Sequence, residues 1–409
     1  MRLVDYEYCN EIAKKEWLDS IQMNVGLRYF GGKTVIGRYI FNNIFNLSVI
    51  MKNQGKKPDI FIDAFTGGGK IGLSIPYGWY DTIIINDINY GVYHYYKYCQ
   101  DDYISLIFMI EKIGSIMNKE MFNLAAYVRN FGLGIEKWKD KNGEPDLVKE
   151  DEVVDPLVAA ALTYWVTAAS YNGITDPKRA IYNLVRKDAD IEDKKQEQQK
   201  IQQIISRACK RIPKLHEKLN NQHYIIENLD YRELIKKYNG LEYTDLQGEK
   251  HDRVEEYREK NKLWYFDPPY HPLCLFGGDP ASYADTFTEE LANQMVEILS
   301  GKYEKDYGKL EYFIKSDYDP QETLRIARQE VNEEYIDNSR KRWYEDIINK
   351  EDNQNNYISN LFKSLEVYPF CKVCVGGFDK SSSRDNKAIG QEFIWCRGFP
   401  EDYNTEEIE

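Results

Sequence analysis

The sequence predicts an α/β fold built on a mainly parallel, mixed sheet. Short apolar runs that resemble buried strands alternate with segments of helical periodicity, and four of these strands lead into an aspartate. Alternation of this kind is typical of a doubly wound sheet with helices on both faces. The 409 residues include 42% hydrophobic and 14% aromatic side chains, which is ample for a core and excludes a disordered chain.

The expected strands are seven short runs, bounded by turn residues or charged residues. In chain order they cover residues 60–63, 82–86, 224–227, 263–266, 312–315, 371–375 and 393–396. The clearest helix has Ile201, Ile204 and Ala208 on one face and continues to Leu219, past an expected kink at Pro213.

One long segment breaks this alternation and predicts a mostly helical inserted domain. It contains loop-like stretches and an apolar helix over residues 156–169. We therefore expect the main domain at 1–100, the inserted domain at 101–193, and the rest of the main domain at 194–409, with surface insertions near 240–262 and 330–366.

Composition also bears on location. No apolar run reaches the roughly 20 residues of a membrane helix, and the first residues lack the apolar core of a signal peptide. The seven cysteines are scattered, and no second pair or nearby histidine completes a zinc site with Cys371 and Cys374. We expect a cytoplasmic protein with reduced cysteines, no bound metal and no membrane partner.

The sharpest motif follows the expected strand at 263–266 and consists of Asp267, Pro268, Pro269 and Tyr270. The prolines end the strand and impose a rigid loop at the carboxyl edge of the sheet, where open α/β sheets bind ligands. The Asp267 carboxylate and the Pro268 carbonyl suit the two N–H bonds of a planar amino-bearing ring, and Tyr270 can stack on that ring. The alternative is an ordinary Asp-Pro turn, but the apolar strand before it and the aromatic residue after it favour a functional loop.

A second motif joins a glycine loop to a more distant acid. The first expected strand ends at Asp63 and leads into Phe65 and the glycines 67–69, and Asp87 follows Gly69 by 18 residues. Glycines let the backbone approach a ligand closely, and an acid roughly 20 residues further on is placed to bind ribose hydroxyls. The pattern therefore indicates a ligand that contains a nucleoside.

A third motif, Tyr29-Phe30-Gly31-Gly32-Lys33-Thr34, has a rival interpretation as the phosphate-binding loop of nucleotide hydrolases. That loop needs a glycine at position 27, which is Leu27, and a preceding apolar strand, which is missing. The other glycine loop also fails, because Ile71 follows Lys70 where Ser or Thr is required. The hydrolase interpretation is therefore rejected at both loops.

In this order, the three motifs resemble the Dam-type (alpha-class) family of S-adenosylmethionine-dependent DNA adenine N6-methyltransferases. The elements that match are Tyr29 to Lys33, Asp63 to Gly69, Asn86 to Asn89 and Asp267 to Tyr270, with weaker matches at 228–231, 283–291 and 389–392. The resemblance spans about residues 26–396. It implies a Rossmann-like methyltransferase fold with an inserted, mostly helical target-recognition domain.

The resemblance also implies roles for individual residues. Asp267 and Pro268 would hold the target amino group, beside Pro269, and Tyr270 would stack on an adenine flipped out of the duplex. The implied cofactor-binding residues are Tyr29, Lys33, Asp63, Phe65, Gly67, Gly69, Asp87, Ile88, Asp230 and Asp267. Asp87 would hold the ribose hydroxyls of S-adenosylmethionine, and the reaction would need neither a metal nor a covalent intermediate.

In such enzymes the inserted domain reads the DNA sequence. Residues 170–173, Ser-Tyr-Asn-Gly, resemble its recognition element, but the usual continuation is replaced by residues 174–179. This departure argues against assuming the familiar GATC target. The residues expected to contact DNA are Tyr171, Asn172, Lys178 and Arg179.

Other functions stay open at this point. An RNA adenine methyltransferase is one, and a DNA cytosine-N4 methyltransferase is another, although Asp267 favours adenine because the cytosine enzymes usually have Ser or Asn there. An inactive cofactor-binding DNA-recognition protein would be expected to lack Asp267 or Tyr270, and both are present. A dinucleotide-dependent oxidoreductase would leave the first and last motifs unexplained.

The net charge of −13 argues against a general nucleic-acid coat protein, but many of the acids gather in the expected insertions and at the end of the chain. Lys178, Arg179, Arg186 and Lys187 form a local basic cluster beside the recognition element, which suffices for phosphate contacts. We expect double-stranded DNA as the partner of a monomeric, prokaryotic or phage-encoded enzyme, and consider a cognate restriction endonuclease as a further partner.

Overall fold

The computed structural model describes residues 11–21, 26–28, 36–128, 154–170, 181–184, 191–269, 274, 287–333, 336, 338–354, 356–365, 370–377 and 391–399.

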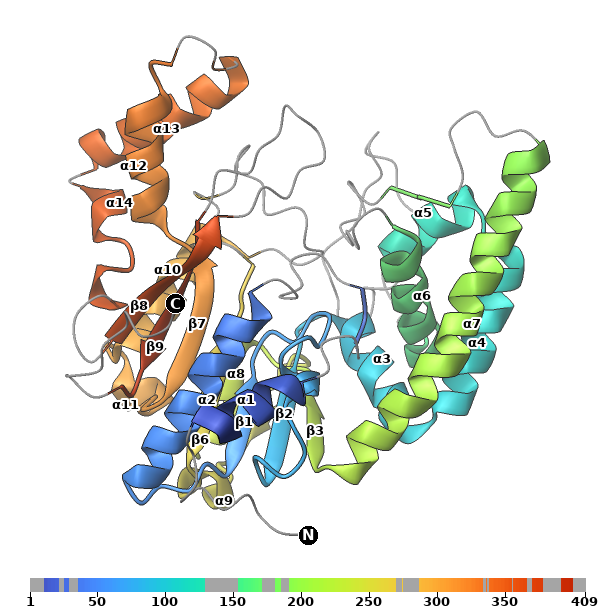
Figure 1. The fold of residues 1–409 in the computed structure, drawn as a ribbon, viewed down its shortest axis with the longest axis horizontal. Coiled ribbons are helices and arrows are strands. Elements are labelled where there is room, and N and C mark those ends of the chain that lie inside the picture. The colour runs from blue at the N-terminus through green and yellow to red at the C-terminus, as the bar shows by residue number, and fades with distance from the viewer. Residues whose placement is uncertain are drawn as a thin grey trace.

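A seven-stranded sheet lies at the centre of the molecule, in the spatial order β3-β2-β1-β6-β7-β9-β8 (Figure 1). Its strands are β1 (Ile60–Asp63), β2 (Thr82–Asn86), β3 (Tyr224–Glu227), β6 (Lys262–Phe266), β7 (Phe313–Tyr318), β8 (Phe370–Gly377) and β9 (Gln391–Arg397). Neighbouring strands from β3 to β7 are parallel, whereas β9 is antiparallel to both β7 and β8. This is the strand order of a doubly wound sheet, with the last strand of the chain, β9, inserted between β7 and the edge strand β8. The predicted α/β, Rossmann-like fold is therefore confirmed.

The bounds of β1, β2 and β3 are those that the sequence predicts, whereas β7 differs most, with 312–315 predicted and Phe313–Tyr318 observed. The strand continues through Ser316 and Asp317, which are buried although they are polar. Asp317 pairs with the buried Lys315 at 2.6 Å, and Ser316 lies in hydrogen-bond distance of Tyr265 on the adjacent strand. Because these polar groups have partners in the interior, they do not end the strand.

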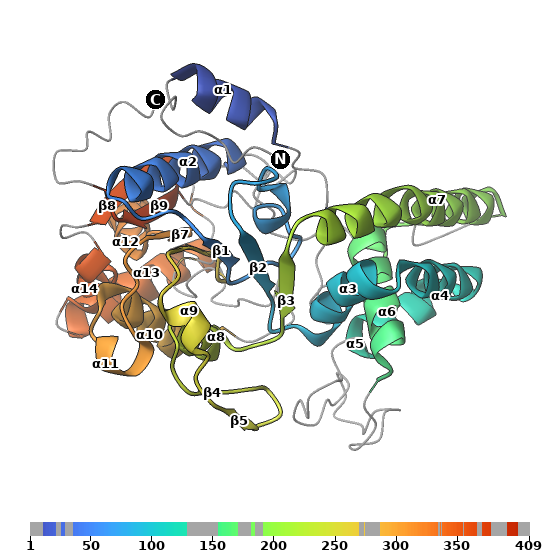
Figure 2. The same cartoon turned by 90° about the horizontal axis from the view of Figure 1, so that it is seen from below.

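Side chains alternate across the sheet and build two cores. Phe61 and Tyr265 belong to the core beneath α2 (Gly37–Asn53), whereas Ile62 and Trp264 belong to the core beneath α8 (Tyr231–Tyr238) and α10 (Glu289–Ser300). Figure 2 shows α2 on one face of the sheet and α8 and α10 on the other. Outside α2 lies α1 (Glu11–Asp19), whose Trp17 packs on Phe41.

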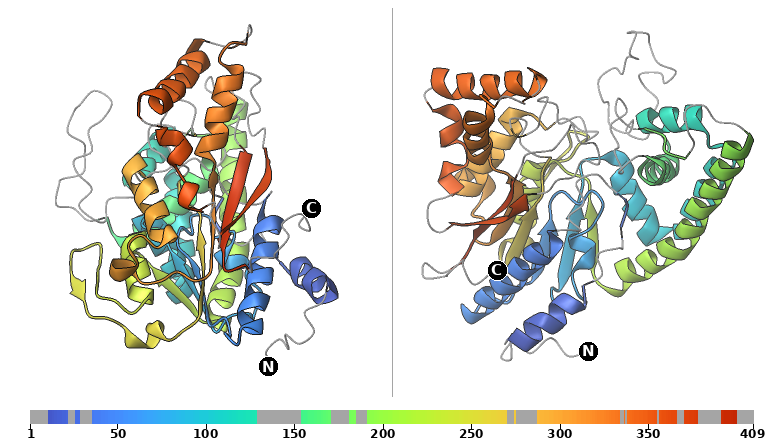
Figure 3. Two further views of the ribbon diagram at one scale, coloured as in Figure 1. Left: turned by 90° about the vertical axis from the view of Figure 1, so that its left-hand side faces the viewer. Right: turned by 45° about the horizontal axis from the view of Figure 1, so that its top comes forward.

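Five helices form a unit beside the sheet (Figure 3), with α6 in contact with α3, α4 and α5. They are α3 (Tyr90–Asp101), α4 (Tyr103–Ile116), α5 (Lys119–Val128), α6 (Pro156–Ala169) and α7 (Ile191–Asn221). Trp165 of α6 donates from Nε1 to the Ile110 carbonyl at 2.9 Å, and Gly114 permits this approach, because a Cβ there would lie 2.7 Å from the Trp165 ring. The single helix α7 runs past Pro213 into β3, and the boundary drawn between residues 193 and 194 lies inside it.

The charged segments form additional elements. The segment near 240–262 contains the hairpin β4 (Tyr243–Thr244) and β5 (Lys250–His251) and the short helix α9 (Glu255–Arg258), and after β7 come α12 (Pro320–Glu330), α13 (Asn338–Asn353) and α14 (Tyr357–Asn360). These last three helices share a small core that includes Leu324, Tyr344 and Ile358. The remaining short helices are η2 (Gly72–Ser74), α11 (Glu304–Tyr307) and η5 (Lys363–Leu365).

The helices α12 and α13 and the five-helix unit rise on opposite sides of the carboxyl edge of the sheet (Figure 1). In the part of the chain that the structure describes, no helix has the length and apolar character needed to cross a membrane.

Candidate active site

Four adjacent strands place aspartates at the carboxyl edge of the sheet. Asp63 ends β1, Asp87 follows β2, Asp230 lies three residues after β3, and Asp267 follows β6. These strands are neighbours in the order β3-β2-β1-β6, and parallel strands present their carboxyl ends at one edge, where ligands bind. The carboxylates of Asp267 and Asp87 both act electrostatically on Asp63, so the three groups lie near one another.

Asp63 is buried at the base of this edge. Its Oδ2 atom accepts a hydrogen bond from the Gly72 N–H at 2.9 Å, whereas its buried Oδ1 atom has no hydrogen-bond partner among the described residues. Burial, together with the charges of Asp267 and Asp87, raises the pKa of Asp63 to about 7, although the Gly72 N–H and, more weakly, the Phe65 N–H act in the opposite direction. A buried acceptor without a donor is a feature that a bound ligand would satisfy.

The glycine loop after β1 needs residues without side chains. Gly67 and Gly69 have φ angles of 46° and 72°, in the left-handed region that favours glycine. A Cβ atom at Gly69 would lie 2.7 Å from the Tyr96 hydroxyl, which donates to the Gly67 carbonyl at 3.0 Å. At Gly26 a Cβ atom would lie 1.8 Å from the carbonyl oxygen of Gly68, so the chain just before the motif at 29–34 touches this loop.

Backbone donors fix Asp87 beside the glycine loop. Its Oδ2 atom accepts from the Gly67 N–H at 2.7 Å and its Oδ1 atom from the Asn89 N–H at 2.9 Å. The next residue, Ile88, exposes 40% of its surface. Asn228 donates from Nδ2 to the carbonyls of Asp87 and Ile88, at 2.7 and 3.0 Å. A carboxylate and an apolar surface are thus held side by side, an arrangement that suits a nucleoside.

Asn86, the last residue of β2, joins the ends of three strands. Its Nδ2 atom donates to the carbonyls of Ala64 and Leu229, both at 3.0 Å, and its Oδ1 atom accepts from the Leu229 N–H at 2.9 Å. In the sequence Asn86 was visible only as part of a motif, and its bonds to the loops after β1 and β3 could not be foreseen.

Asp230 has a different environment from the other three aspartates. It caps α8, and Arg232 donates from Nε to its Oδ1 atom at 2.7 Å and from Nη2 to its Oδ2 atom at 3.0 Å. Both carboxylate oxygens therefore already have a charged donor. The neighbouring Tyr231 ring forms a cluster with Phe65 and Phe287, with ring centroids 5.8 to 6.3 Å apart, so Phe65 connects the glycine loop to α8.

Asp267 is half-buried and Pro268 is buried, directly after β6, and Pro269 follows them. The Asp267 Oδ1 atom accepts a hydrogen bond from the Ser316 hydroxyl of β7 at 2.8 Å. Ser316 was not among the residues predicted from the sequence, where the only signal is the polar Lys-Ser-Asp run at 315–317 inside an otherwise strand-like segment.

Several predicted site residues lie outside the described part of the chain and stay predictions. They are Tyr29, Lys33, Tyr171, Asn172, Lys178, Arg179 and Tyr270.

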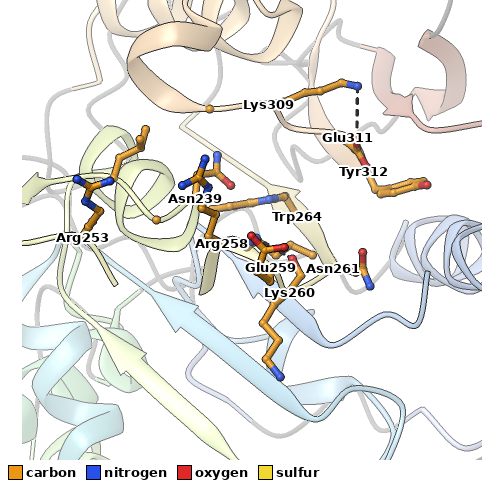
Figure 4. Close-up of a pocket in the computed structure, with 14 residues that line it drawn as sticks. Asn239, Arg253, Arg258, Glu259, Lys260, Asn261, Trp264, Lys309, Glu311 and Tyr312 are labelled. Carbon is orange, nitrogen blue, oxygen red and sulfur yellow. Dashed lines mark hydrogen bonds and ion pairs between the residues drawn. The ribbon is translucent and has the colours of Figure 1, made fainter. Parts of the chain in front are cut away.

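A separate cavity of about 480 Å³ lies at the opposite, amino edge of the sheet (Figure 4). Three of its five basic side chains have acidic partners: Arg253 and Arg258 pair with Glu255 at 3.4 and 3.8 Å, and Lys309 pairs with Glu311 at 3.4 Å. Because parallel sheets bind ligands at the carboxyl edge, the candidate active site is the cluster around Asp63, not this cavity.

A family model for D12 class N6 adenine-specific DNA methyltransferases matches residues 29–295, more than half of the chain. The chain belongs to this family. The match confirms the resemblance to Dam-type enzymes and takes in the glycine loop, Asp87 and Asp267. None of the curated proteins compared with the chain matches it.

The sheet of this D12-class methyltransferase is therefore that of a Rossmann-like methyltransferase, and the reaction of the family is methylation of adenine in DNA. The strands and helices that follow α10, including β7 and Ser316, lie beyond the matched residues.

Proposed function

We propose that this D12-class methyltransferase transfers a methyl group from S-adenosylmethionine to the N6 amino group of an adenine that is flipped out of duplex DNA at a specific site. The observation that carries the proposal is the convergence of Asp63, Asp87 and Asp267 at one edge of the sheet. Acceptors for a cofactor and for an amino group are then available at the same edge.

The described residues fit the cofactor. The Oδ1 atom of Asp63 offers an acceptor for the ammonium group of the methionine part. Asp87 would accept from the ribose hydroxyls and Ile88 would contact the adenine ring, beside Gly67 and Gly69. The unplaced Tyr29 and Lys33 would complete the site, and Asp230 would be a weaker ligand because Arg232 holds both of its oxygens. When bound, S-adenosylmethionine supplies an electrophilic methyl group.

The loop at 267–270 would bind and orient the amino group that is methylated. An adenine amino group is a weak nucleophile, because its lone pair is delocalised into the ring. Asp267 and the Pro268 carbonyl would accept its two N–H bonds, favour a tetrahedral nitrogen and direct its lone pair away from both acceptors. Pro269 keeps the loop rigid, and Tyr270 would stack on the flipped base. Holding both reactants in near-attack geometry can lower the barrier by roughly 7–11 kcal/mol.

The inserted segment at 101–193 would recognise the DNA target. Its helices α4, α5 and α6 belong to the five-helix unit, which rises beside the carboxyl edge of the sheet (Figure 1), and Tyr171, Asn172, Lys178 and Arg179 belong to the same segment. We propose a monomer that binds duplex DNA, with a cognate restriction endonuclease as the partner to look for near the gene.

Expression in a host without DNA methylation, followed by direct sequencing for N6-methyladenine, tests the proposal. Modification at one short motif is expected and would identify the target. Unmodified DNA in cells that accumulate the folded protein would refute the proposal. Assays of the purified protein on matched DNA and RNA, read out for N6-methyladenine and N4-methylcytosine, separate it from the RNA adenine and DNA cytosine alternatives.

A further inference from the structure

A chain of two hydrogen bonds runs through the interior to the catalytic aspartate. The Ser316 Oγ atom lies 2.8 Å from Asp267 Oδ1, and the Tyr265 hydroxyl lies 3.1 Å from Ser316 Oγ. Ser316 and Tyr265 expose 0% and 1% of their surfaces, so bulk water does not compete for these bonds.

The direction of the chain follows from the donors that are available. An ionised carboxylate can only accept, so Ser316 donates its single proton to Asp267. The Ser316 oxygen must then accept from the Tyr265 hydroxyl. Hydrogen bonds to a charged acceptor are stronger than those between neutral groups, so Asp267 Oδ1 is held firmly.

The sheet keeps Ser316 in place. Phe266, the last residue of β6, is opposite Lys315 in the register of the two parallel strands, so Asp267 leaves β6 beside Ser316. Two residues further along β7, the Tyr318 carbonyl accepts from the Cys274 thiol at 3.8 Å. β7 therefore contacts the chain on both sides of the loop that contains Pro268 and Pro269.

We propose that Ser316 is a positioning residue for methyl transfer, which holds Oδ1 of Asp267 and thereby fixes the orientation of the carboxylate that accepts from the adenine amino group. The proposal rests on the proposed function. It concerns a residue beyond the 29–295 segment that matches the family.

The test compares Ser316→Ala with wild-type protein in steady-state methylation of duplex DNA. The loss of one hydrogen bond to a charged group predicts a kcat about 10- to 100-fold lower. KM for S-adenosylmethionine and for DNA should stay within about twofold, because Ser316 contacts neither. Ser316→Thr, which restores a hydroxyl, should recover most of the loss in kcat, and Tyr265→Phe should lower kcat less than Ser316→Ala does.

Ser48→Ala is the matched control. Ser48 is equally buried, donates to the Ile44 carbonyl at 2.7 Å and lies 2.6 Å from the Tyr80 hydroxyl, but it belongs to α2. Both alanine variants should lower the melting temperature, and only Ser316→Ala should lower kcat.

Two results would overturn the inference: a normal kcat in folded Ser316→Ala, or an equal loss of kcat in Ser48→Ala. Wild-type protein that forms no N6-methyladenine would instead contradict the proposed function, so the two failures are distinguishable.

Discussion

The two halves of the candidate site hold their carboxylates in different ways. On the side proposed to bind the cofactor, Asp87 and Asp63 accept from the backbone N–H groups of Gly67, Asn89 and Gly72, at 2.7 to 2.9 Å. On the side proposed to bind the target base, Asp267 is held by the Ser316 side chain, 49 residues away on another strand.

The difference suits the two tasks. Backbone N–H donors are present whatever the side chains are, so glycines and two acids are enough to specify the loop that we propose for the cofactor. Asp267 lies in a loop with two prolines, and Pro has no N–H, so a donor for its carboxylate must come from elsewhere in the fold.

Asp267→Ala should have the largest effect and tests most directly whether the two sides of the site have different roles. We expect kcat for methyl transfer to fall about 100- to 1000-fold, the size found when one preorganised polar group is removed from an active site. Affinity for S-adenosylmethionine, measured by isothermal titration calorimetry, should change little. Asp245→Ala, in the β4–β5 hairpin, serves as the control and should leave both quantities unchanged. Normal turnover in Asp267→Ala would contradict the assigned role.

Asp87→Ala should show the reverse pattern. The loss of hydrogen bonds from ribose hydroxyls to a charged acceptor predicts an affinity for S-adenosylmethionine about 10- to 100-fold lower. At saturating cofactor, kcat should fall much less, because Asp87 takes no part in holding the amino group. Asp102→Ala, which removes the exposed cap of α4, is the control. An Asp87→Ala protein that lost kcat but kept its affinity would reverse our assignment of the two sides.

The same contrast explains what the sequence could predict. Local signals predict the seven strands, the fold class and the cluster of Asp63, Asp87 and Asp267. These signals are the apolar runs and the acids at their ends. The bond from Ser316 to Asp267 joins residues 49 positions apart, and the Lys315–Asp317 pair, although local, is buried by the surrounding fold. Polar residues inside a strand indicate its end unless their partners are known, and for this reason the prediction for β7 stopped at 315.

The protonation of Asp63 gives a prediction that depends on pH. Burial raises its pKa to about 7, so below that pH the free protein carries a protonated Asp63. If Asp63 must be ionised to accept from the ammonium group of the cofactor, affinity should rise about tenfold per pH unit as the pH increases towards 7 and then level off. Calorimetry across this range measures the slope. Asp63→Asn should bind more weakly and lose the slope, and an equally steep slope in that variant would assign the titration to another group.

Asn228→Ala should have the smallest effect and tests whether backbone positioning matters on the cofactor side. Asn228 holds the carbonyls of Asp87 and Ile88, and each neutral hydrogen bond contributes about 0.5–1.5 kcal/mol. We expect affinity for S-adenosylmethionine to fall about three- to tenfold and the free energy of unfolding by about 1 kcal/mol. Asn239→Ala removes a comparable amide, bonded to the Tyr307 carbonyl at 2.7 Å, beside the cavity at the amino edge. Urea unfolding should show similar losses in the free energy of unfolding for both variants. Only Asn228→Ala should lower the affinity for S-adenosylmethionine, because only Asn228 supports the loop that carries Asp87.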